Sequence, residues 1–199
     1  MFLAVFDNFL DTALLEEVDK ELLLIEWSKV FERANSYMLE CNDIEKYPIL
    51  KKMFQRYSSS SFLNFLENIS NITGIISDPY MVGSGYSQIK DHGDLKPHID
   101  FNWNDKLKLY RSLSFIIYLT TPENGGDIEF IDYAKIKVKR NRAVIFSHSE
   151  QIRHMVHPVT GTRNAIRFFY YTSNLQTPSN SHRSLYGIES GKPADVHGE

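Results

Sequence analysis

A chain of 199 residues has the size of one domain and is long enough to bury a hydrophobic core. Its composition, 42% hydrophobic and 24% charged, is that of an ordinary soluble globular protein. The formal net charge is −3 and the sequence contains no basic run, so we expect neither nucleic acid nor an anionic membrane surface as a partner.

Three further features indicate the cellular setting. Cys41 is the single cysteine, which excludes an internal disulfide and fits a reducing compartment. The start, MFLAVFDNFLD, has too short an apolar run and too little positive charge for a secretion signal. No stretch approaches the ~20 apolar residues of a membrane span. We therefore expect a cytoplasmic protein, and the sequence does not indicate its oligomeric state.

The first 80 residues show mainly helical spacing of apolar side chains, as in Leu14, Val18 and Leu22. A serine run at 58–61 supplies a turn and an N-cap for the helix that follows it. The pattern predicts a short strand at 2–6 and then helices, at 11–24, 27–40, 47–57 and 60–71.

Beyond residue 80 the pattern shortens to strands and turns. The segment 111–119 alternates, with Leu113, Phe115, Ile117 and Leu119 on one face, which we expect to pack against the helices. Further strands are predicted in ENGGDIEFI, RAVIF and NAIRFFYYT. Short strands broken by Gly, Pro and Asn turns favour a sandwich or jelly roll over βαβ units.

These patterns together predict an α+β fold, with a jelly-roll or cupin-like barrel (a double-stranded β-helix) supported by N-terminal helices. We expect a single domain over 1–172, in which 1–80 is mainly helical support and 81–172 is the jelly-roll core. Residues 173–199 are rich in Ser, Pro, Gly and His, so a partly flexible surface arm is predicted there.

The segment KPHID places a histidine and a carboxylate two residues apart. In a strand, His98 and Asp100 share one face, where they can bind one metal ion or simply form an exposed polar surface. A jelly roll brings distant strands around one cavity, so a third ligand is expected from 146–171. Two histidines and one carboxylate that leave three coordination positions open are typical of non-haem Fe(II) oxygenases.

A longer series of motifs carries a family resemblance. The run from about Tyr86 to Thr172 resembles the Fe(II)/2-oxoglutarate oxygenases of the prolyl 4-hydroxylase type, and the shared elements occur in the family's order and spacing. They are His98-Ile-Asp100, Tyr118-Leu119, Gly125-Gly126, Val144-Ile-Phe146, His154 with Pro158-Val159, and Arg163.

The resemblance implies a role for each matching residue. His98, Asp100 and His154 would bind the iron, and Arg163 would receive the distal carboxylate of 2-oxoglutarate through its planar, permanently charged guanidinium. Tyr118 either shares that carboxylate or is a sheet aromatic with a solvated hydroxyl. The ligand is His154 rather than His157, because the family's proline follows its ligand by four residues.

Two arginines and a glycine pair are also noted. Arg111 and Arg167 are candidates for binding a substrate carboxylate, or else they are surface ion-pair partners. The pair Gly125-Gly126 is expected to serve only the turn.

The resemblance also implies an activity. We expect a dioxygenase that uses Fe(II), 2-oxoglutarate and O2, with ascorbate as a reductant, and that hydroxylates an unactivated C–H bond while releasing succinate and CO2. A prolyl or other peptide residue, a free amino acid and a small natural product are all candidate substrates. Two alternatives stay open, namely a cupin-like metal-dependent hydrolase or isomerase and a catalytically silent binding module on the same fold.

Overall fold

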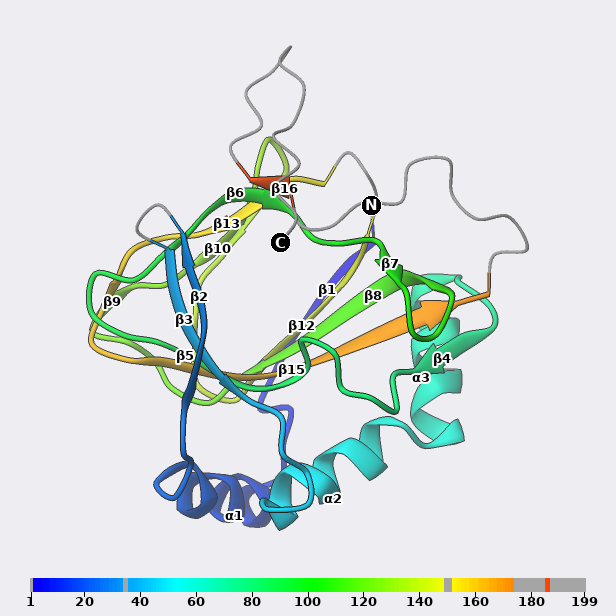
Figure 1. Cartoon of the computed structure of the whole chain (residues 1–199), viewed down its shortest axis with the longest axis horizontal. Helices are drawn as coiled ribbons and strands as arrows, with labels where there is room; N and C mark the ends of the chain where they lie inside the picture. Colours follow the sequence, from blue (N-terminus) through cyan, green and yellow to red (C-terminus); the bar gives the residue numbers. More distant parts are fainter. Residues whose placement is uncertain (1, 34–35, 149–151, 174–184, 187–199) are drawn as a thin grey trace.

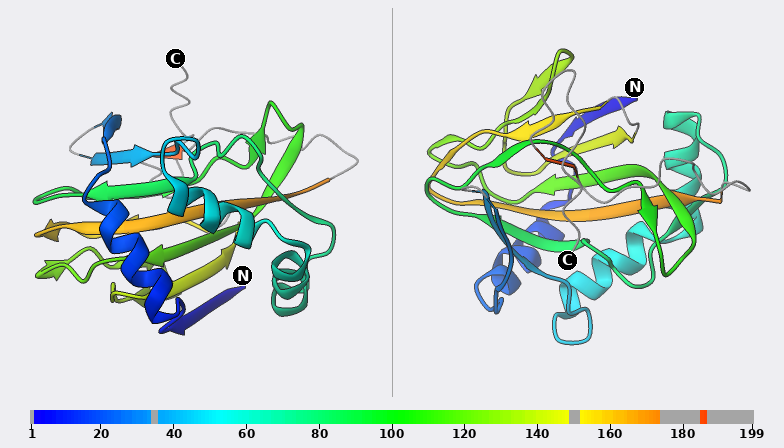
Figure 2. Two further views of the ribbon diagram at one scale, coloured as in Figure 1. Left: turned by 90° about the horizontal axis from the view of Figure 1, so that it is seen from below. Right: turned by 45° about the horizontal axis from the view of Figure 1, so that its top comes forward.

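Two facing β-sheets and a layer of helices make up the computed structural model, which describes residues 2–33, 36–148, 152–173 and 185–186. The helices α1 (Thr12–Leu22), α2 (Pro48–Tyr57) and α3 (Ser60–Ser70) lie on one side of the larger sheet, and the smaller sheet lies on the other (Figure 1). Figure 2 shows α1 and α2 crossing the strands of the larger sheet. The predicted jelly-roll architecture with supporting helices is therefore confirmed.

The larger sheet has nine strands in the described part of the chain. Its main order is β1 (Leu3–Asp7), β12 (Arg142–Ser147), β8 (Leu109–Tyr118), β15 (Arg163–Thr172), β5 (Gly85–Ile89), β3 (Ser36–Cys41) and β2 (Ser28–Arg33), with β4 (Ile75–Ser77) paired to β15 and β7 (Trp103–Asn104) paired to β8.

The smaller sheet carries fewer and shorter strands. Its order is β11 (Ala134–Ile136), β10 (Ile128–Phe130), β13 (His154–Val156), β6 (Leu95–Ile99) and β16 (Leu185–Tyr186). A separate two-stranded ladder joins β9 (Asn124–Gly125) to β14 (Val159–Thr160).

Strand β8 separates the two halves of the hydrophobic core. Its residues Phe115 and Ile117, with Leu113 and Leu119 in the same series, are buried against the helices, as the alternating pattern predicted. The intervening residues Ile116 and Tyr118 pack instead between the two sheets. Because side chains of a strand alternate, one strand supplies both the helix-facing core and a wall of the cavity between the sheets.

The helix boundaries follow from local capping chemistry. Asp11 caps α1, since its side chain accepts a hydrogen bond from the backbone N–H of Leu14 at 2.9 Å. Pro48 occupies the first turn of α2, where a missing N–H is tolerated. Ser59, within the predicted serine run, caps α3. Within the described ranges, no helix has the length and apolar content required to cross a membrane.

The predicted helix at 27–40 is wrong, because this segment forms the hairpin β2–β3. Residues 38–41 alternate in a strand-like manner: Cys41 faces the helical core, while Met38 joins a cluster on the cavity side. Backbone pairing of Leu39 with Gln88 of β5 then extends the larger sheet. Tertiary pairing thus overrides a local pattern that is also compatible with a helix.

The predicted arm at 173–199 lies mostly outside the described residues. Its described portion is β16, which pairs with β6 through Leu185 opposite Ile99. The division of the chain into one domain over 1–172 and an arm remains a prediction.

A buried carboxylate joins the helical layer to the sheet. Glu21 at the end of α1 accepts hydrogen bonds from the backbone N–H groups of Ile49 (2.7 Å) and Leu50 (2.8 Å), at the start of α2. It also accepts one from the Tyr86 hydroxyl of β5 at 2.9 Å. One side chain therefore satisfies the free donors at a helix N-terminus and fixes two helices to the sheet.

We expect Glu21→Ala to lower the free energy of unfolding by about 2–4 kcal/mol, because three donors, two of them in buried hydrogen bonds, lose their acceptor. Glu17→Ala on the same helix removes a largely exposed ion pair with Lys52 and should change it by less than about 0.5 kcal/mol. Urea unfolding of both variants measures the difference. Equal losses would contradict the role assigned to Glu21.

Candidate metal centre and co-substrate pocket

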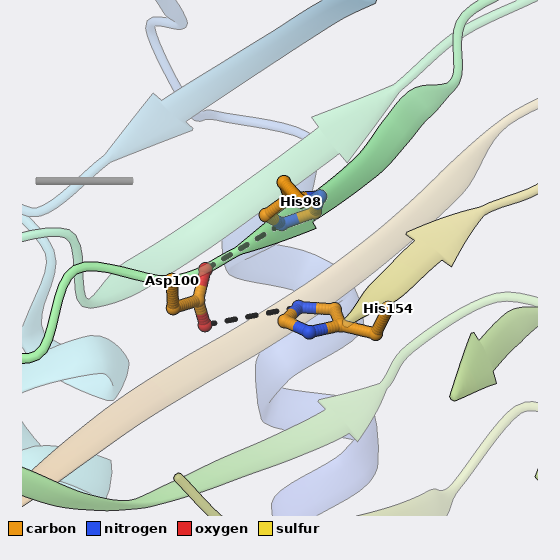
Figure 3. Close-up of side chains that lie close together, drawn as sticks. All are labelled: His98, Asp100 and His154. Carbon is orange, nitrogen blue, oxygen red and sulfur yellow. Dashed lines mark ion pairs between the residues drawn. The ribbon is translucent and has the colours of Figure 1, made fainter. Parts of the chain in front are cut away.

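A pair of histidines lies on neighbouring strands of the smaller sheet. His98 on β6 lies directly opposite His154 on β13 in the antiparallel ladder, and their ring centroids are 4.3 Å apart. Asp100 follows β6 by one residue and, two positions after His98, projects from the same face (Figure 3). The strand register thus brings residues more than fifty positions apart to one point.

The carboxylate lies between the two imidazoles. Asp100 Oδ1 is 3.5 Å from His98 Nε2, and Asp100 Oδ2 is 3.8 Å from His154 Nε2. One ligand atom from each of the three residues lies within 4.8 Å of the others, and among the described residues this is the one such group found. Figure 3 shows the three side chains converging on a shared space.

The protonation states suit a metal site. The Nδ1–H of His98 donates to the Lys96 carbonyl at 2.7 Å, so Nε2 is the ring atom that faces Asp100. Burial, with a contribution from His98, lowers the pKa of His154 to about 4. Burial alone would raise the pKa of the Asp100 carboxyl, but the neighbouring His154 and His98 hold it well below its usual range. At neutral pH the site therefore presents a neutral His154 and a carboxylate.

This donor set fits a first-row divalent metal such as Fe(II). Two nitrogens and one oxygen on one side of an ion match the facial arrangement that leaves positions open for small ligands. A cavity beside them is lined by residues of both sheets. Ser114, Ile116, Phe146, Arg163 and Arg167 come from the larger sheet, and Leu95, Ile128 and Val156 come from the smaller one.

A buried tyrosine lies beside a buried arginine of the cavity wall. Arg163 is only 4% exposed, and its Nε donates to the Gly126 carbonyl at 2.9 Å. The guanidinium carbon is 4.8 Å from the centroid of the Tyr118 ring. The Tyr118 hydroxyl is buried and has no hydrogen-bond partner in the described structure, and burial raises its pKa. An acceptor such as a carboxylate would satisfy both groups.

The paired glycines do more than make a turn. At Gly125 a Cβ atom would lie 1.8 Å from the carbonyl oxygen of Pro158, so β9 approaches β14 too closely for any side chain. At Gly126 a Cβ atom would lie 3.2 Å from Arg163 Cδ. The expectation that these residues serve only the turn was therefore too narrow, since Gly126 also orients Arg163.

Of the two arginines without an assigned role, Arg167 lines the cavity, and Arg111 is buried beside Asp100. Arg111 is 1% exposed, and its guanidinium carbon lies 3.3 Å from the Phe101 ring centroid and 3.5 Å from that of Phe169. Its Nη1 is 3.8 Å from Asp100 Oδ2. Arg167 lines the metal cavity and contacts Glu40. The surface alternative is thus wrong for Arg111, whereas Arg167 combines a cavity position with an ion pair.

His157 lies apart from the metal cluster. Its Nε2 is 2.6 Å from Glu129 Oε2, and it borders a different depression next to Pro158. Being three residues from His154 on an extended segment, it points away from the cavity into which His154 projects.

Some residues in or near the cavity were not identified from the sequence. Met38 and Glu40 belong to the hairpin that was interpreted as a helix, so their alternation was not used. Phe169 shares the cavity face of β15 with Arg163 and Arg167, and strand alternation alone was sufficient to find it. Phe101 directly follows a ligand, and no sequence signal indicated that its ring covers a guanidinium.

Comparison with known proteins supports this chemistry. Residues 84–171 match the family model described as the 2OG-Fe(II) oxygenase superfamily. Enzymes of this superfamily use Fe(II), 2-oxoglutarate and O2. None of the curated proteins compared with the chain matches it.

Solved structures share the fold at low sequence identity. A Pseudomonas putida prolyl-4-hydroxylase superposes with a TM-score of 0.65 and 14% identity, covering 86% of this chain and 93% of its own. The viral collagen prolyl hydroxylase of Paramecium bursaria Chlorella virus-1, solved with 2OG, gives 0.59 and 16%, covering 87% and 97%. A Trichoplax adhaerens prolyl hydroxylase, in complex with a hypoxia inducible factor peptide, gives 0.58 and 18%, covering 85% and 83%.

The family match over the jelly-roll core explains the motif order, and the solved structures show the same fold over most of the chain. Residues 84–171 therefore match the 2OG-Fe(II) oxygenase superfamily, and the chain shares its fold with solved prolyl hydroxylases.

Proposed function

We propose that this enzyme hydroxylates an unactivated C–H bond of a small molecule or peptide, with His98, Asp100 and His154 holding Fe(II). The observation that supports this most is the buried triad, whose ligand atoms lie within 4.8 Å of one another in a cavity that also contains Arg163. A hydrolase on the same barrel has no need for a buried arginine facing a dicarboxylate.

The protein's task is to bind and orient the reactants. When bound, Fe(II) and 2-oxoglutarate supply the oxidising chemistry with O2, and succinate and CO2 are released. Arg163 receives the distal carboxylate of 2-oxoglutarate, with the Gly126 carbonyl fixing its Nε. Tyr118 donates its otherwise unpartnered hydroxyl to the same carboxylate.

Arg111 positions the carboxylate ligand from behind. Its guanidinium is confined between the rings of Phe101 and Phe169, where a cation over an aromatic face is attracted to it. From there Nη1 faces Asp100 Oδ2, so the positive charge favours the ionised form and fixes the side chain that must bind the metal.

The prolyl hydroxylases of similar fold suggest a substrate class. Their names describe hydroxylation of prolyl residues, and the Trichoplax enzyme was solved with a peptide. A small-molecule or peptide substrate therefore fits this chain, and its reacting C–H bond would lie near the triad.

The proposed reaction is tested by succinate release with Fe(II), 2-oxoglutarate and ascorbate during a substrate screen. Asp100→Ala should abolish substrate-dependent succinate release while circular dichroism stays native. Asp105→Ala is a matched control, because its side chain is 83% exposed and outside the cavity. Full turnover by a verified iron-free preparation, or by Asp100→Ala, would refute the proposal.

Metal retention distinguishes the two neighbouring histidines. We expect His154→Ala to lose Fe(II) affinity by more than the roughly 10–100-fold that follows loss of an outer-shell partner. His157→Ala removes only a partner of Glu129 and should retain the metal after dialysis. Metal analysis of both dialysed variants measures this. Loss of iron from His157→Ala alone would reverse the assignment.

Substitutions of two buried tyrosines should have opposite effects, one on 2-oxoglutarate binding and the other on stability. Tyr118→Phe should weaken 2-oxoglutarate binding roughly tenfold or more, yet keep or slightly raise the stability of the free protein, because its hydroxyl is unpartnered. Tyr170→Phe removes a hydroxyl that donates to the Tyr57 carbonyl at 3.0 Å, so it should cost about 1 kcal/mol of stability and leave binding unchanged. Calorimetric titration and thermal unfolding measure both. Unchanged binding in Tyr118→Phe would exclude its hydroxyl from the pocket.

A further inference from the structure

The cavity holds a second arginine that the co-substrate does not use. Arg167 lies on β15 four residues after Arg163 and on the same face, and both line the cavity that contains the triad. Four residues along a strand correspond to about 13 Å, so a carboxylate bound by Arg163 does not reach Arg167. Arg167 is therefore available to the other reactant.

An acidic side chain from the β2–β3 hairpin accompanies this arginine. Nη2 of Arg167 is 2.8 Å from Glu40 Oε2, and the two side chains are 15% and 16% exposed. Nη1 contacts the Met38 sulfur at 3.3 Å, while the buried Nε has no hydrogen-bond partner in the described structure. The guanidinium is thus held by one contact on each terminal nitrogen and keeps donors for a ligand.

Strand β5 lies between Glu40 on β3 and Arg167 on β15, and it carries small residues at this level. Glu40 lies opposite Ser87 of β5, and Arg167 lies opposite Gly85. Long side chains from β3 and β15 therefore meet across small residues on the cavity face of β5. Backbone ladders already join the three strands, so the ion pair is not required for their connection.

The energetics favour a binding role over a structural one. A largely buried ion pair loses hydration that its own attraction only partly returns, and apolar residues of similar size commonly replace such a pair without loss of stability. Here Arg167 lines the cavity that contains the triad, and Glu40 contacts its guanidinium. Opposite charges on adjacent groups match a ligand that carries both signs close together.

We infer that the substrate is a free α-amino acid, whose carboxylate binds Arg167 and whose ammonium group binds Glu40. This inference rests on the proposed function, because it places the amino acid's side chain toward the triad for hydroxylation. A residue inside a peptide carries neither charge at its backbone, so it would leave both Arg167 and Glu40 without new partners in a site that the ligand desolvates.

The test is calorimetric binding to the enzyme loaded anaerobically with Fe(II) and 2-oxoglutarate. The probes are the proteinogenic L-amino acids, with the Nα-acetyl derivative and the C-terminal amide of each one that binds. We expect at least one free amino acid to bind and each modification to weaken its binding by about tenfold or more.

Two variants assign the selectivity to its residues. Arg167→Met should remove the preference for the acid over the amide, and Glu40→Gln should remove the preference for the free amine over the acetylated one. Arg140→Met is the matched control, because it breaks an exposed ion pair with Asp19 and should keep both preferences. If the ion pair had only a structural role, the two variants would not each lose a different one of the two preferences.

The inference is overturned if no free amino acid binds, if the doubly blocked residue binds as tightly as the free one, or if Arg167→Met and Glu40→Gln retain both preferences. Binding needs no turnover, so its outcome is independent of the proposed reaction. Selective binding of a free amino acid without succinate release would refute the proposed hydroxylase reaction but support the inferred ligand class. Succinate release that only blocked peptides stimulate would support the hydroxylase reaction but refute the inferred ligand class.

Discussion

The register of two short strands determines the chemistry of this protein. The pairing of β6 with β13 sets His98 opposite His154, and the period of two along an extended chain adds Asp100 to the same face. A shift of one residue in either strand would turn a ligand out of the cavity. The role of every other residue in the site depends on its position relative to these three side chains.

The larger sheet supplies the hydroxyl and guanidinium groups beside the triad. Its strands β8 and β15 carry Tyr118, Arg163 and Arg167 on the face opposite the helices, while the other face is buried under α1, α2 and α3. The buried Glu21 joins the helical layer to β5, so the supporting helices hold the sheet that positions the arginines. Rigid strands are suited to holding groups within the small tolerances that catalysis requires.

Much of this arrangement followed from local patterns. The alternation over 111–119 indicated which face of β8 packs on the helices, and the spacing of His98 and Asp100 indicated a shared face. The resemblance to the 2OG-Fe(II) oxygenases followed from the order of motifs, which reflects a fixed topology rather than any single residue. These features are predictable because strand periodicity is a local property.

Other features depend on contacts that are distant in the sequence. The hairpin at 28–41 was interpreted as a helix, since only its pairing with β5 settles its conformation, and Glu40 was missed with it. Arg111 gave no sign of burial, because the rings that enclose it come from Phe101 and from Phe169 on another strand. Long-range pairing and stacking of this kind leave no periodic signal in a single sequence.

The central claim is that one cavity holds Fe(II) at the triad and 2-oxoglutarate between the metal and Arg163. Its most direct test is an anaerobic absorption titration of the Fe(II)-loaded protein with 2-oxoglutarate, with glutarate, which lacks the ketone, as the reference ligand. Chelation through the C1 carboxylate and the C2 ketone predicts a visible charge-transfer band that saturates at one 2-oxoglutarate per iron and is absent with glutarate. A protein that binds iron but gives no such band, or the same response to both ligands, would contradict the account.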